Sequence, residues 1–166
     1  MDEWTKEIVF HRYLEAADVL RRLPPVRFPK EFGNAWPDVL RDMDDIRGHD
    51  PDERVREFAA VARRAPPPAA AITRQEEVND WTNRYLRAWP GPRRVLLAYA
   101  LCVVAGLSFR ALCRKRGWAR TTAMRRIDKA LLIVRDGLSK DNIALRMADV
   151  DFVGQMEPNP PHEMAR

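Results

Sequence analysis

The sequence predicts an all-α protein, and three observations lead to that class. Apolar residues recur every three or four positions, as one face of a helix requires. Ala, Leu, Arg and Glu together outnumber Val and Ile, which favours helix over sheet. Pro and Gly divide the 166 residues into segments of helical length. This length and a 46% hydrophobic content suit one compact core, with or without a small satellite domain.

Residues 1–64 are expected to form an N-terminal helical module. Its first helix runs from Glu3 to Arg22 and ends before Pro24. The apolar stripe of that helix consists of Val9, Tyr13, Ala16, Ala17 and Leu20. Two short helices follow, one starting at Pro37 and one after Asp50. The aromatic residues of the irregular stretch between the first two helices, Phe28, Phe32 and Trp36, either cover this module's core or anchor a partner.

A linker of Pro and Ala over residues 65–72 separates the module from the rest of the chain. Thr73 and Glu76 fit a capping box, so the next helix is expected to start at Thr73 and reach Trp89. We assign residues 73–140 to a second domain. A short helical extension over 141–154 and a disordered tail over 155–166 are expected after it.

Two glycines mark a short helix, a turn and a second helix inside residues 73–140. An apolar helix from Arg93 ends at Gly106, Ser108 caps the helix FRALCRKR, and Gly117 ends it. The buried side chains expected after the turn are Ala123, Ile127, Leu131 and Val134. Two helices joined by a turn containing Gly form the helix-turn-helix layout that reads the DNA major groove.

The charge distribution points to the same segment. Residues 91–131 hold ten basic side chains and one acidic side chain, whereas residues 1–60 have a net charge of −4 and should face away from DNA. Residues expected to read base edges lie on the first turns of the second helix: Arg120, Thr121, Met124 and Arg125. Residues expected to contact phosphate are Arg110, Arg114, Lys115, Arg116 and Arg126.

Residues 90–138 resemble region 4 of bacterial sigma factors. The matching features are Arg93 and Arg94 before an apolar helix, Gly106 and Ser108, Gly117, and the pattern from Thr122 through Arg125 to Ala130-Leu131. The motifs EAADVLRRLPPVR and WPDVL are similar to those of GafZ-like proteins, which activate and antiterminate transcription of gene transfer agent and prophage genes. This resemblance implies double-stranded DNA and RNA polymerase as partners, with a second activator protein beside them.

Other classes of function find little support in the sequence. No catalytic constellation, cofactor-binding motif or metal-ligand spacing is present, so we expect no enzyme and no cofactor. No apolar run is long enough to cross a membrane and the start has no signal-peptide pattern, so a cytoplasmic protein is expected. Two alternatives remain open: a small terminase subunit that packages phage DNA, and a polymerase-binding module that does not contact DNA.

Overall fold

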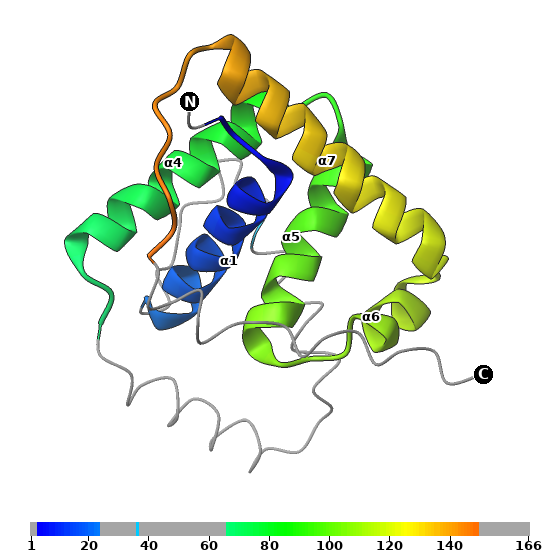
Figure 1. Ribbon diagram of the computed structural model, residues 1–166. Helices are drawn as coiled ribbons and strands as arrows, with labels where there is room; N and C mark the ends of the chain where they lie inside the picture. Colours follow the sequence, from blue (N-terminus) through cyan, green and yellow to red (C-terminus); the bar gives the residue numbers. More distant parts are fainter. Residues whose placement is uncertain (1–2, 24–35, 37–65, 150–166) are drawn as a thin grey trace.

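The computed structural model describes residues 3–23, 36 and 66–149, and every regular element among them is an α-helix. The all-α prediction is therefore confirmed. The elements expected within residues 37–64 and the tail over 155–166 lie outside the described residues, as do Phe28 and Phe32. Figure 1 shows α1 beside α4 on one side and α5 and α7 on the other. None of the helices in the described ranges is long and apolar enough to span a bilayer.

Helix α1 (Lys6–Arg22) is the central helix of the fold. Thr5 caps its start by accepting a hydrogen bond from the Ile8 backbone N–H, and Leu23 leaves the helix in an extended conformation before Pro24. The residues of the predicted stripe are fully buried except Leu20, which is half-buried. Because α1 packs against α4, α5 and α7, nearly its whole circumference is covered.

Helix α4 (Ala69–Tyr85) begins earlier than the sequence suggested. Pro68 precedes the first turn, and Ala69, Ala70 and Ala71 continue into the helix because alanine is the best helix former. The capping box at Thr73 is wrong, since the Thr73 hydroxyl lies inside the helix and donates to the Ala69 carbonyl oxygen. The expected linker over 65–72 therefore gives way to helix from residue 69 onward.

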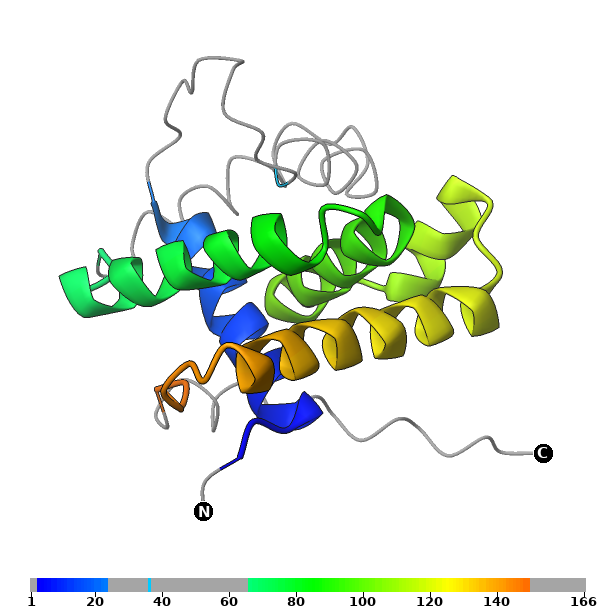
Figure 2. The same ribbon diagram turned by 90° about the horizontal axis from the view of Figure 1, so that it is seen from above.

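Helices α5 (Pro90–Ala105), α6 (Phe109–Arg116) and α7 (Arg120–Lys140) follow the expected order. Pro90 is the first residue of α5. Backbone N–H groups in the first turn of a helix have no partner within the helix, so the N–H that proline lacks costs no hydrogen bond there. The apolar side chains Leu96, Leu97 and Leu101 are fully buried. Figure 2 shows α7 running the length of the molecule opposite α4, with α1 crossing between them.

One apolar core includes side chains from α1 and from every later helix. The Trp4 and Trp81 rings meet edge to face with their centroids 5.3 Å apart, and Trp36 is fully buried in the same core. Trp36 Nε1 also donates to Asn79 Oδ1 on α4. The described part of the expected N-terminal module is thus not separate from the rest, because Trp36 packs in a core shared with the later helices and not in a core of the module alone.

The predicted helical extension over 141–154 is wrong for its described part, because residues 143–149 form no helix. After Asn142, whose φ is +51°, the chain turns back and runs beside α1 and α4 (Figure 1). Trp4 Nε1 donates to the Ile143 carbonyl and Arg12 Nη1 to the Arg146 carbonyl. In a helix, these two carbonyl groups would accept from backbone N–H groups of the same segment. Because they accept from the Trp4 and Arg12 side chains instead, residues 143–149 stay non-helical.

Candidate nucleic-acid interface

The short helix α6 and the first half of α7 are joined by residues 117–119. Gly117 has φ +66°, a left-handed conformation that favours glycine, and it ends α6 as predicted. The Trp118 N–H then donates to the Cys113 carbonyl at 2.8 Å, which closes the helix end. Ser108 caps α6 by accepting from the Ala111 N–H. Both boundary signals read from the sequence are confirmed.

The inner faces of α6 and α7 are apolar and fix how the two helices lie on the core. Leu112 and Cys113 of α6 are buried, and all four side chains predicted for the inner face of α7 are buried. Trp118 is half-buried and packs against the same core. Burial raises the pKa of the Cys113 thiol above its ordinary value, so this cysteine behaves as a small apolar residue.

The outer face carries the predicted DNA-binding residues. All nine are exposed except Arg116, which is half-buried. Within the described part of the chain, five of them form no ion pair: Arg110, Arg114, Arg120, Arg125 and Arg126. Their positive charge is therefore available to an external anion.

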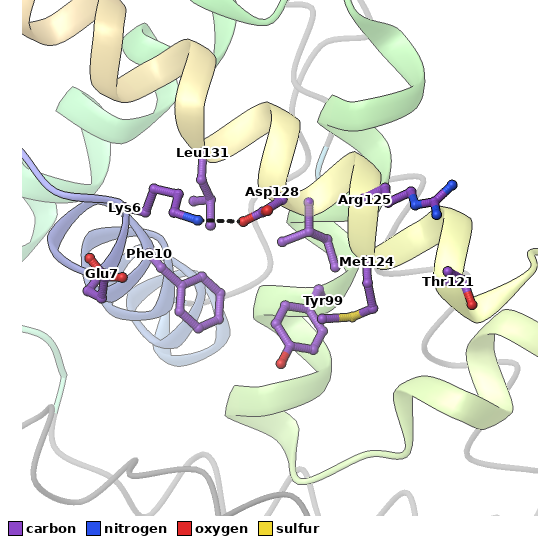
Figure 3. Close-up of a pocket in the computed structure, with 10 residues that line it drawn as sticks. Lys6, Glu7, Phe10, Tyr99, Thr121, Met124, Arg125, Asp128 and Leu131 are labelled. Atoms are coloured by element: carbon purple, nitrogen blue, oxygen red, sulfur yellow. Dashed lines mark hydrogen bonds and ion pairs between the residues drawn. The ribbon is translucent and has the colours of Figure 1, made fainter.

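A groove of about 520 Å³ lies between side chains of α7, α1 and α5. Thr121, Met124 and Arg125 line it from α7, so the structure brings three of the four predicted base-reading residues together. Figure 3 shows Met124 directed toward Tyr99, whereas Thr121 and Arg125 point away from α1. Arg120 belongs to the same turn of α7 but does not line the groove.

The opposite wall of the groove comes from the first turns of α1. Lys6, Glu7 and Phe10 line it, and Lys6 Nζ lies 2.9 Å from Asp128 Oδ1 on α7. The expectation that the acidic N-terminal third faces away from this surface is wrong for Glu7. Its pKa is lowered by hydrogen bonds from its own backbone N–H and from the Thr5 hydroxyl, so the carboxylate is charged at neutral pH.

Aromatic rings connect α1 to the α6–α7 unit. Phe10 of α1 stacks on Tyr99 of α5 at 5.4 Å, and Tyr99 meets Phe109 of α6 edge to face at 4.9 Å. Burial raises the pKa of the Tyr99 hydroxyl, which keeps the ring neutral. The position of α6 therefore depends on a ring from the N-terminal helix, a link that no sequence pattern indicated.

The other flank of α7 faces the turn between α4 and α5. Lys129 Nζ lies 3.6 Å from the centroid of the Trp89 ring, which is 40% exposed. Arg126 covers Gly91, where an added β-carbon would lie 3.8 Å from the guanidinium carbon. Both Lys129 and Trp89 are additions to the predicted site, and Lys129 extends the basic surface of α7 toward the Trp89 ring.

An ionic cluster between α1 and α4 was also missed. Arg12 has no exposed surface, and it donates to the Arg74 carbonyl and to Glu77 Oε2. Glu15, also buried, accepts from Arg74 at 2.8 Å, and Arg146 pairs with Glu77 at 2.7 Å. The one signal in the sequence was that Arg12 lies within the apolar face of α1, next to Tyr13.

The family described as "Domain of unknown function (DUF6362)" matches residues 21–134, which is more than half of the chain. The match runs from the end of α1 into α7 and so includes the whole α6 helix and the first turns of α7. No curated protein and no solved structure matches the chain.

Proposed function

The chain belongs to the DUF6362 family, and we propose that it is a DNA-binding regulator of transcription that acts with RNA polymerase. The observation that carries the proposal is the set of five exposed arginines on α6 and α7 that form no ion pair with the described residues. Arginines elsewhere in the fold, such as Arg12, Arg74 and Arg146, are paired with carboxylates. Exposed arginines on a short helix and on the longer helix after a glycine turn, without ion pairs among the described residues, suit the phosphates of duplex DNA.

Under this proposal, the position of each side chain indicates whether it contacts base edges or phosphates. Arg125 and Thr121 point away from the core and are the strongest candidates for base edges, because arginine can bond guanine bidentately and threonine can touch a thymine methyl. Arg110, Arg114 and Arg126 fix the register on phosphate. Met124, directed toward Tyr99, contributes an apolar edge beside them.

Salt dependence tests DNA contact directly. The full-length protein should bind duplex DNA with an affinity that falls steeply as salt rises, because each neutralised phosphate releases counterions. Arg114→Ala should lower the slope of log affinity against log salt by about 0.9. Arg84→Ala removes the same charge from α4, where Arg84 pairs with Asp141, and should leave the slope unchanged. Equal slopes for both variants, or binding insensitive to salt, would contradict DNA contact by α6.

Base reading by Arg125 needs a separate measurement. Arg125→Ala should relax the preference at one base position at a cost of about 1–3 kcal/mol, while Arg114→Ala should weaken binding to all sequences alike. Affinities for a set of duplexes that differ by single base pairs would show the difference. A uniform loss in both variants would remove Arg125 from the base-reading set.

The role with polymerase rests on the sequence resemblance to sigma region 4 and to GafZ-like proteins. We infer that the chain activates prophage-like or gene transfer agent genes in the cytoplasm and travels with polymerase past terminators, with a second activator as a further partner. Transcription from a template with the selected DNA site and a downstream terminator tests this. Read-through should rise when the protein is added, and no change in initiation or read-through would contradict the proposal.

A further inference from the structure

Asp128 is the one acid between Gly106 and Leu131, a stretch that holds eight basic side chains. It lies on α7 two turns after Thr121, and it lines the same groove as Thr121, Met124 and Arg125. Its side chain is 61% exposed. A carboxylate at the edge of a phosphate-binding surface opposes binding by charge repulsion, so its presence there needs an explanation.

The simplest explanation is that Asp128 attaches α1 to α7 through Lys6. An exposed ion pair of this kind contributes little to stability, between about 0 and 1 kcal/mol. Helix α1 is already held by the Trp4 contact with Trp81, by the stack of Phe10 on Tyr99 and by the buried Arg12. Attachment alone therefore accounts poorly for a carboxylate at this position.

Beside arginines that bind base acceptors, a carboxylate can recognise a base donor, which arginine cannot. A carboxylate only accepts hydrogen bonds, and in the major groove cytosine presents only a donor, its N4 amino group. Adenine places the N7 acceptor beside its N6 donor, and guanine presents only acceptors. Lys6, 2.9 Å away, fixes the orientation of the carboxylate and offsets its charge against nearby phosphates. The pair can thus approach a base edge with no net charge.

We propose that Asp128 is a specificity-determining residue that selects cytosine at one position of the DNA site, with Lys6 as its positioning residue. The proposal rests on the DNA-binding function proposed above. Asp128 lies closer to α1 than Arg125 and Thr121 do. We therefore expect its base pair to lie on the α1 side of the base pairs that Arg125 and Thr121 read. Asp128 therefore adds discrimination against guanine that the arginines cannot supply.

Selection of bound duplexes from a random-sequence pool tests the proposal with the full-length protein. Wild type should enrich a motif that includes a cytosine, and Asp128→Asn should lose roughly tenfold discrimination at that position only. Asp136→Asn is the matched control, since Asp136 lies on the same helix, pairs with Arg135 and does not line the groove. It should select the wild-type motif. Lys6→Gln should weaken the cytosine preference without moving the other positions.

The outcomes separate the two proposals. An unchanged motif from Asp128→Asn would overturn the role of Asp128 and leave DNA binding standing. A uniform gain in affinity for all sequences would show that Asp128 only repels phosphate, which also overturns it. Failure of wild type to enrich any motif would instead remove sequence-specific DNA reading, and with it both proposals. Thermal unfolding of each variant shows whether a lost preference follows from a lost fold.

Discussion

Gly137 shows how a single residue limits the packing of α7 on α4. A β-carbon added there would lie 2.5 Å from Tyr85 Cδ1 and 2.9 Å from its Cγ, so the whole ring would have to move. The ring is held by the bond that the Tyr85 hydroxyl donates to Asp141, and burial raises the pKa of that hydroxyl to about 12. We expect Gly137→Ala to lower the free energy of unfolding by about 1–3 kcal/mol, measured by denaturant titration.

The matched control for this substitution lies one residue earlier. Asp136→Ala also introduces alanine on α7, but at an exposed position, and should change the free energy of unfolding by less than about 0.5 kcal/mol. If Gly137→Ala were as stable as the control, the close packing of α7 against Tyr85 would be incorrect.

Glu7 bears on DNA binding through its charge. Glu7 lines the groove from α1, and its lowered pKa keeps the carboxylate ionised at neutral pH. Under the proposed function it repels phosphate, so Glu7→Gln should strengthen binding to random duplexes at low salt by roughly two- to fivefold. Glu76→Gln removes the same charge from the exposed face of α4 and should have a smaller effect. The difference between the two variants should shrink as salt screens the charges. If Glu76→Gln strengthened binding at low salt as much as Glu7→Gln, Glu7 would not lie at the DNA interface.

At the scale of elements, Ser108 and Thr73 have different roles: Ser108 caps the start of α6, whereas Thr73 lies inside α4. Ser108 accepts the Ala111 N–H at the start of α6, so Ser108→Ala should cost about 1 kcal/mol of stability. Thr73 lies within α4, and Thr73→Ala should be neutral or slightly stabilising because alanine favours the helix interior. Denaturation midpoints of the two variants give the comparison. A loss for Thr73→Ala equal to that for Ser108→Ala would support a cap at Thr73 after all.

These caps also show which parts of the fold the sequence could predict. Gly106, Ser108 and Gly117 act on their immediate neighbours, so α5, α6 and the start of α7 followed from local chemistry. The start of α4 did not, because three alanines after a proline fit a linker and a helix equally well. Whether Ala71 becomes buried depends on the tertiary fold and not on its neighbours in sequence.

In the candidate site, too, features set by neighbouring residues could be predicted, whereas contacts between distant segments could not. Periodicity along α7 correctly separated the buried Ile127 from the exposed Arg125. It could not show that Met124 is directed toward Tyr99 or that Lys6 reaches Asp128, because these pairs join distant segments. The buried Arg12 is another case, since its partners come from α4 and from the segment after α7.

On the scale of the whole molecule, the N-terminal helix and the proposed DNA-binding unit share one core. Val9 and Tyr13 are fully buried by later helices, and Phe10 supports α6 through Tyr99. Arg12 has no exposed surface and pairs with the buried Glu15 as well as with Glu77, and breaking a buried pair by removing one partner costs about 3–5 kcal/mol. Helix α1 is therefore part of the scaffold that holds α6 and α7, in addition to lining the groove.

This sharing of one core predicts the behaviour of a fragment. The sequence assigned residues 73–140, with their helix-turn-helix layout, to a separate domain, but without α1 this fragment exposes apolar surface of α4, α5 and α7 and leaves Glu77 without Arg12. Such a fragment also lacks the first turn of α4. We expect it to lose cooperative thermal unfolding and to bind duplex DNA far more weakly than residues 1–149, which retain every described element. Circular dichroism melts and salt-matched binding measurements on the two proteins provide the test. A fragment that melts cooperatively and binds with the affinity of residues 1–149 would show that α1 is dispensable and that the two-domain division holds.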